Sequence, residues 1–247
     1  MKLRIAILAV ALMVPQTLFA QDADGVTLRL GVGAKSKPEY PGADANNVGA
    51  TGSFSIERFQ FGDFGGGGGG TGLGFGGSVR IVSERSAEEF DELTGLADVD
   101  TSIEVGGGLK YAQPGYKVFA NLRYGVIGHE SLVGEVGGDL IYRPSDQVTL
   151  SAGPRLFWGS DDYAQTYFGV TAEESSASAF DEFDAQGGFL SQGLKAEATY
   201  EFNEDWGVTG SIRFDRLQED AASSPITQSE DQVTGSIVLT RRITFGF

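Results

Sequence analysis

Residues 206–217, WGVTGSIRFDRL, decide the fold of this chain. Apolar Ile212 and Phe214 alternate with ionic Arg213 and Asp215, so a strand through them has one apolar face and one charged face. Apolar and polar residues alternate in the same way in several other stretches, and tyrosine or tryptophan stands at many strand ends. A soluble sandwich also alternates, but it does not usually carry ions on the inner face of nearly every strand. The combination is typical of a transmembrane β-barrel with an apolar outer face and a charged lumen.

Ten strands are predicted in an all-β, antiparallel, up-and-down transmembrane barrel. They cover residues 27–34, 53–61, 73–82, 101–111, 116–124, 132–142, 147–157, 187–202, 206–217 and 232–247. The short connections are 112–115, 143–146 and 203–205, and the long ones are 35–52, 83–100, 158–186 and 218–231. Outer-membrane barrels have short periplasmic turns and longer external loops, so we expect both termini in the periplasm. Two further short strands within Ala164–Val170 would give the alternative of twelve.

Three local features interrupt the pattern. The apolar positions change phase between Ile56 and Phe59, which predicts a bulge around Glu57 and Arg58. Arg241 falls on an otherwise apolar face, so it marks either a second bulge or a position near the membrane interface. The run of six glycines at 65–70 lacks the Gly-Lys-Ser/Thr of a phosphate-binding loop and is interpreted as a flexible turn.

Residues 1–20 are predicted to be a cleaved signal peptide, and residues 21–247 an outer-membrane barrel domain. Lys2 and Arg4 precede an apolar stretch that is too short to span a bilayer, and Ala20 is a plausible cleavage point. Removing these two bases leaves 16 bases against 34 acids, a net charge of −18, which disfavours nucleic acid as a partner. The chain has no cysteine, so it has neither disulfides nor thiolate metal sites.

The polar faces of the strands place charges of both signs in the lumen. The expected inward residues are Arg29, Arg80, Lys110, Lys117, Arg123, Arg155, Lys195 and Arg213 with Glu104, Glu135, Asp139, Glu197, Glu201 and Asp215. Near-balanced charges in a narrow barrel favour pairing, so we expect the lumen to be plugged by its own side chains.

The long loops are acidic, and we expect a solvated, self-repelling surface. Alternatively, their carboxylates hold Ca²⁺ or Mg²⁺ that bridges the lipopolysaccharide, but no metal site can be assigned. No cofactor is predicted.

His129 is the only histidine and the place to look for hydrolase chemistry. A catalytic dyad needs a partner within hydrogen-bond reach, and Glu130, Asp161 and Asp162 are the acids near it in the predicted topology. Glu130 is adjacent in sequence and points to the opposite face of a strand. We therefore expect a histidine that is packed or hydrogen-bonded at the rim, no catalytic residue, and no enzyme.

Several motifs follow one another along the chain: Pro38–Asp44, Arg123–Gly134, Asp162-Tyr163, Tyr167–Val170 and Asp220–Ile226. In these motifs and in their order, the chain resembles the MltA-interacting protein (MipA/OmpV) family of outer-membrane proteins. The resemblance implies a scaffold that links a lytic transglycosylase to a murein synthase in the outer membrane, among lipid and lipopolysaccharide. A narrow small-solute channel, a surface adhesin and, less favoured, a hydrolase are the alternatives. Phe247, with Phe245 and Ile243 at alternate positions, also resembles the signal recognised by the barrel assembly machinery.

Overall fold

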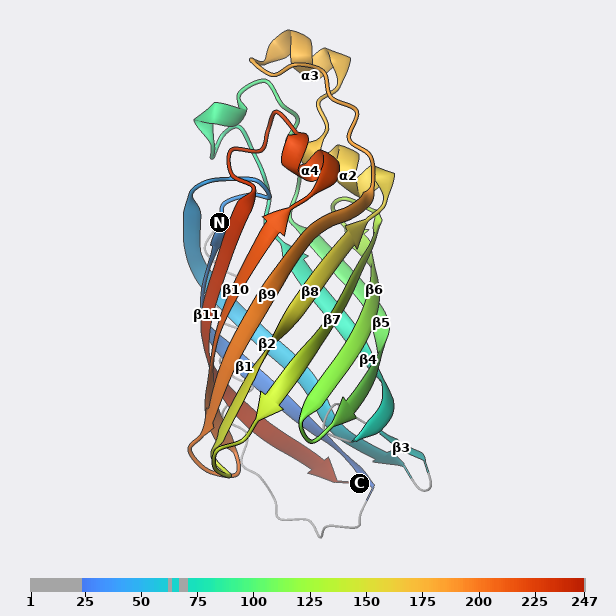
Figure 1. Ribbon diagram of the computed structural model, residues 1–247, viewed down its shortest axis with the longest axis vertical. Coiled ribbons are helices and arrows are strands. Elements are labelled where there is room, and N and C mark those ends of the chain that lie inside the picture. The colour runs from blue at the N-terminus through green and yellow to red at the C-terminus, as the bar shows by residue number, and fades with distance from the viewer. Residues whose placement is uncertain (1–23, 62–63, 67–70, 247) are drawn as a thin grey trace.

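The computed structural model describes residues 24–61, 64–66 and 71–246 and shows one antiparallel sheet that curls around a lumen (Figure 1). The strands are β1 (Gly25–Pro38), β2 (Asn46–Phe61), β3 (Phe64–Gly66), β4 (Gly72–Val82), β5 (Ser102–Gln113), β6 (Tyr116–Ile127), β7 (Leu132–Tyr142), β8 (Val148–Gly159), β9 (Gly188–Glu201), β10 (Trp206–Leu217) and β11 (Asp231–Gly246). Their order in the sheet is β3-β2-β1-β11-β10-β9-β8-β7-β6-β5-β4. The first and last long strands are therefore neighbours, as an up-and-down barrel requires.

All ten predicted strands are present. The additional β3 falls in the segment interpreted as a flexible turn and pairs with the end of β2. Among the described residues, no backbone pairing joins β2 or β3 to β4, so these strands form the two edges of the sheet. The predicted signal peptide, the glycines at 67–70 and Phe247 lie outside the described residues.

The alternative of twelve strands is wrong, because most of Ala164–Val170 belongs to a helix. The helices are α2 (Asp161–Phe168), α3 (Ala172–Ala177) and α4 (Glu219–Ser223), with a 3-10 turn η2 at Asp91–Leu93. Tyr163, Ala164, Tyr167 and Phe168 are buried together, at the three- and four-residue spacing of one helix face. No helix in the described part of the chain is long and apolar enough to cross a membrane.

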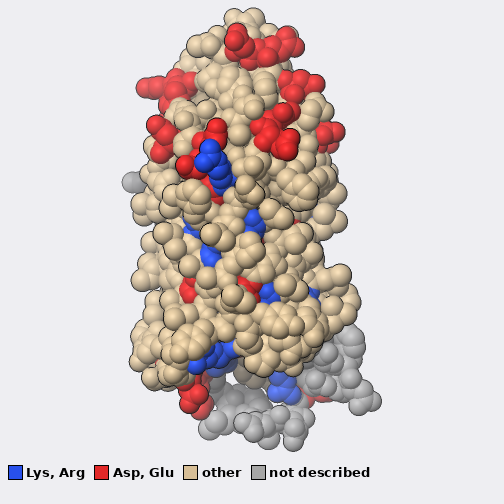
Figure 2. Space-filling view, viewed as in Figure 1, with Lys and Arg blue, Asp and Glu red and all other residues tan. Residues whose placement is uncertain are grey.

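The two faces of the strands differ as predicted. Ile212 and Phe214 of β10 are 56% and 45% exposed on the outer face. The side chains of Arg213 and Asp215, between them, are 23% and 16% exposed and bond each other on the inner face. Figure 2 shows the result from one side, with a broad and mostly uncharged band below an acidic end.

The predicted bulge is confirmed at Glu57. Thr27 pairs with Arg58 and Leu28 pairs with Ile56, so Glu57 has no partner residue on β1. Arg241, in contrast, lies in regular register opposite Trp206, and its guanidinium carbon is 5.3 Å from the centroid of that ring. Arg241 thus lies near the turn that starts β10 and not at a bulge, which supports the interface alternative.

Candidate functional site: an ion-paired lumen beneath a folded cap

Four loops at one end of the barrel fold together, and we call them the cap (Figure 1). They are residues 39–45, 83–101, 160–187 and 218–230. A buried apolar cluster joins all four loops through Tyr40, Ala43, Phe90, Leu93, Leu96, Val170 and Ile226. The expectation of a merely solvated surface was therefore incomplete. The acids do lie outside, but apolar residues spaced between them in the sequence bury one another inside.

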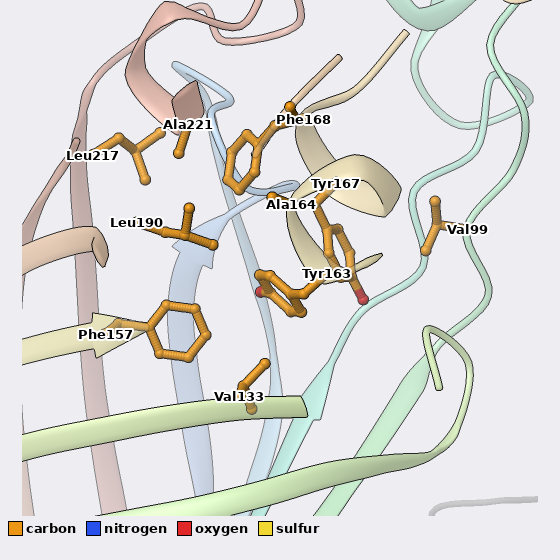
Figure 3. Close-up of a cluster of buried hydrophobic side chains, with 11 residues drawn as sticks. Val99, Val133, Phe157, Tyr163, Ala164, Tyr167, Phe168, Leu190, Leu217 and Ala221 are labelled. Carbon is orange, nitrogen blue, oxygen red and sulfur yellow. The ribbon is translucent and has the colours of Figure 1, made fainter. Parts of the chain in front are cut away.

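The helix α2 lies in the mouth of the barrel and fills it with aromatic rings. Figure 3 shows Tyr163 and Tyr167 pointing down from α2, with the ring of Tyr163 beside Phe157 and Val133 of the barrel wall. The Tyr167 hydroxyl is 3.0 Å from Ser102 Oγ, and the Tyr163 hydroxyl accepts from Arg80 Nη2 at 3.3 Å. Burial raises the pKa of both tyrosines, so both hydroxyls stay protonated at neutral pH.

Arg85 is the only base of the predicted loop 83–100, and it joins that loop to α2. Its guanidinium is buried and donates from Nη1 to the carbonyl oxygen of Tyr167 at 3.0 Å. Burial lowers the pKa of Arg85, whereas the nearby Glu174 and other groups oppose that shift. The group remains a cation that links two parts of the cap.

Glu104 of β5 is the centre of a buried network directly beneath α2, which we call the Glu104 network. Its carboxylate is 0% exposed. It accepts from Arg80 Nε at 2.7 Å, Arg123 Nε at 3.0 Å and His129 Nε2 at 3.1 Å. Arg80 also lies 4.3 Å from the centroid of the Phe157 ring, which adds a cation–π contact. Three strands and the loop of His129 are thereby joined through one carboxylate.

His129 lies over this network and is hydrogen-bonded through both ring nitrogens. Its Nδ1 accepts from the backbone N–H of Ser131 at 3.1 Å, so the proton lies on Nε2 and is donated to Glu104. Gly125 makes room for the ring, because a Cβ there would lie 2.5 Å from Cε1. Both ring nitrogens are occupied, and neither is hydrogen-bonded to a hydroxyl group of the described residues.

His129 is hydrogen-bonded at the rim, as expected, and the acids considered near it in the sequence are not its partners. Glu130 is exposed, and Asp161 instead accepts from the backbone N–H of Gly187 at 2.8 Å. The true partner, Glu104, lies 25 residues away on the neighbouring strand. It could have been found from the register, because Ile103 pairs with Ile127 just before the His129 loop.

The remaining inward charges form the predicted ion pairs. The pairs are Arg29–Glu57, Arg29–Glu201, Lys117–Asp139, Arg155–Asp139, Lys195–Glu197, Arg213–Glu135, Arg213–Asp215 and Arg242–Glu57. All six predicted acids are paired, and seven of the eight predicted bases are among their partners. The eighth base, Lys110, lies over Gly74. Glu57 and Arg242 were missed: the bulge turns Glu57 inward, and Arg242 occupies an even position of β11.

A metal site was left unassigned by the sequence. Within the described ranges, no three histidine, aspartate or glutamate side chains are grouped so that they could hold an ion.

Comparison with known proteins identifies the family of this barrel. The chain matches the family described as MltA-interacting protein MipA over residues 30–243. It is 30% identical to the MltA-interacting protein of Escherichia coli (strain K12) over 79 residues, 32% of each chain. It is 37% identical to the outer membrane protein OmpV of Vibrio cholerae over 77 residues, 31% of this chain and 29% of that relative. These matches span about a third of the length of either relative.

Among solved structures, the toluene transporter TodX of Pseudomonas putida aligns with 93% of this chain and 91% of its own at 12% identity and a TM-score of 0.34. The family match covers far more of the chain than either pairwise alignment, because it extends from β1 to β11. The chain belongs to the MltA-interacting protein MipA family and is an outer-membrane β-barrel protein.

Proposed function

We propose that this chain is a non-enzymatic scaffold that holds a murein enzyme, a lytic transglycosylase, at the outer membrane and links it to a murein synthase. The observation that carries the proposal is the family match over residues 30–243, together with a relative named for its interaction with MltA. The interior of the barrel supports it, because ion pairs occupy the inner face and both nitrogens of His129 are engaged. The external surfaces are then the parts available for interaction.

The surface available to a periplasmic partner is small. At the end opposite the cap, the strand connections that the structure describes in full are residues 114–115, 143–147 and 202–205, and β3 lies at the same end (Figure 1). Short turns face the periplasm in outer-membrane barrels, so a murein enzyme would meet these turns and the strand ends beside them. The cap would face away from the cell wall.

Site-specific photocrosslinking in native envelopes tests this directly. A photoreactive residue is placed at exposed Asp146 or Glu204 in the turns, and at exposed Glu88 in the cap as the matched control. The scaffold predicts that a murein transglycosylase is crosslinked from a turn position and not from Glu88. Recovery of no murein enzyme from either turn would remove the support for this function.

A narrow anion channel is the second candidate, because the inward Lys35 has no carboxylate partner among the described residues. Planar-bilayer recordings of the purified protein separate the two functions. We expect no steady conductance, since Arg213–Glu135 and Arg29–Glu201 join strands that are not neighbours across the inner face. A steady, anion-selective conductance would favour the channel instead.

A further inference from the structure

An apolar groove crosses the outer face of the barrel wall where β5, β6 and β7 lie side by side (Figure 1). The register of these strands explains the groove. Ala120 of β6 lies opposite Leu109 of β5, so Gly107 is its diagonal neighbour on the same face. Gly138 of β7 lies diagonally on the other side of Ala120. Three small residues in adjacent strands therefore leave a depression between larger side chains.

The groove consists of two adjoining hollows with apolar walls. Their volumes are about 520 and 580 Å³, within the range of sites for small ligands. The two hollows share Leu109, Ala120, Val136 and Leu156, so they form one continuous surface. Leu109, Val136 and Leu156 are exposed on the face that meets lipid. The groove thus opens to the hydrocarbon of the membrane, and an apolar chain is the occupant that its walls fit.

One end of the groove reaches the turn end of the barrel. Tyr111 near the end of β5 lines this end, and its ring centroid is 6.2 Å from that of Tyr116 at the start of β6. The Tyr111 hydroxyl accepts from Gln113 Nε2 at 2.8 Å. Tyrosines at the ends of membrane strands lie at the level of the lipid headgroups. The polar end of a lipid in the groove would therefore lie beside Tyr111 and Gln113.

A cation lies beside the same turn. Arg143, directly after β7, is exposed and donates from Nη1 to the carbonyl oxygen of Pro114 at 2.5 Å. Pro114 follows Gln113, so the guanidinium lies at the polar end of the groove. Among the described residues Arg143 has no carboxylate partner, and its other nitrogens donate no hydrogen bond. A guanidinium group with free donors matches the oxygens of a phosphate.

We propose that the groove is a binding site for one phospholipid of the periplasmic leaflet, with an acyl chain along Ala120 and the phosphate at Arg143. The leaflet follows from the turns, which face the periplasm in outer-membrane barrels. A chain lying in a groove contacts more protein atoms than one lying on a convex wall, and dispersion attraction grows with the number of contacts. The charged hydrogen bond to the phosphate adds to this attraction and fixes the position of the headgroup.

Tryptophan fluorescence can report occupancy, because Trp158 lines the groove and the chain has only two tryptophans. The full chain carrying Trp206→Phe is refolded in detergent and titrated with phosphatidylglycerol that has brominated acyl chains, which quench Trp158 on contact. Ala120→Phe fills the groove. Ala196→Phe is the matched control, because Ala196 is exposed on β9, points to the same outer face and lies outside both hollows. Arg143→Gln removes the cation.

We expect saturable quenching in the parent protein and in Ala196→Phe, with one bound lipid per chain by native mass spectrometry. Binding by Ala120→Phe should be at least about tenfold weaker, because the added ring overfills the groove. Arg143→Gln should also bind more weakly. Heat-modifiable gel mobility shows whether each variant folds, and Ala120→Leu replaces Ala120→Phe if the latter misfolds.

Three results would overturn the proposal. Quenching that never saturates would show that lipid meets this wall only as bulk solvent. Equal affinities of Ala120→Phe and Ala196→Phe would show that the groove is not the site, and an unchanged affinity of Arg143→Gln would remove the headgroup from it. A dimer in detergent that binds no lipid and is dissociated by Ala120→Phe would assign the groove to a second copy of the chain.

Discussion

At the scale of single residues, Glu104 shows how the barrel holds charge in a place where water is scarce. Its two carboxylate oxygens accept from two arginines and one histidine, so the buried negative charge is fully compensated by donors. Removing one partner of a buried pair leaves the others uncompensated and usually costs about 3–5 kcal/mol. An exposed pair is worth less than about 1 kcal/mol, because water and salt screen it.

The change Glu104→Gln should therefore lower the free energy of unfolding by about 3 kcal/mol or more. Glu230→Gln is the matched control, because its pair with Arg216 joins side chains that are 47% and 55% exposed. Urea titration of both variants in liposomes measures the difference. Equal, small losses in the two variants would show that Glu104 is hydrated and not at the centre of a buried network.

His129 provides a second test at this scale. Because both ring nitrogens are engaged by Ser131 and Glu104, His129→Ala should weaken the fold without removing any hydrolysis. Lipase and protease assays of the purified wild type and variant check this expectation. An activity present in the wild type and lost in folded His129→Ala would restore the hydrolase hypothesis.

At the scale of elements, the cap depends on hydrogen bonds between loops that are distant in the sequence. Glu174 completes the capping box of α3 through Thr171 and also accepts from the backbone N–H of Ala97 at 2.9 Å. Burial raises the pKa of Glu174, but the donors of Thr171 and Ala97 outweigh burial, and the net pKa lies below the ordinary 4.5. A carboxyl group with a lowered pKa in the folded state stabilises that state when it is ionised.

The contact of α3 with loop 83–101 should therefore persist above about pH 4.5 and weaken as the pH falls through the lower pKa of Glu174. Hydrogen exchange at residues 172–177, referenced to an unstructured peptide, measures this opening. Glu174→Gln should open the segment at neutral pH and remove the pH dependence. The neighbouring Glu173→Gln should behave like the wild type, and the same response in both variants would exclude the assigned role of Glu174.

The strands could be predicted from the sequence, whereas the helix α2 and the partner of His129 could not. The strands were predictable because alternation along a strand is local, and the phase change at Glu57 located the bulge for the same reason. The helix α2 was missed because eight residues are too few for helical periodicity to stand out from a short apolar run. The partner of His129 depends on the register of two strands, which alternation alone leaves open.

At the scale of the whole molecule, charge is sorted by position. Paired charges lie within the lumen, unpaired acids lie over the cap, and the outer face between cap and turns is largely apolar (Figure 2). This sorting follows from the membrane, since an arginine on the lipid face at the bilayer midplane costs about 2–4 kcal/mol in a barrel. Ile212→Arg should consequently reduce the free energy of folding into liposomes by about that amount, and Ile212→Val should change it little.

The central claim is that alternate residues of one strand meet lipid and lumen. The chain has no cysteine, so single cysteines at 212 and 213 can be labelled without background. With a fluorophore that is quenched by brominated or spin-labelled lipid, the account predicts strong quenching for Ile212→Cys and weak quenching for Arg213→Cys in refolded protein. Strong quenching at 213 with weak quenching at 212 would invert the two faces of β10 and contradict the barrel topology.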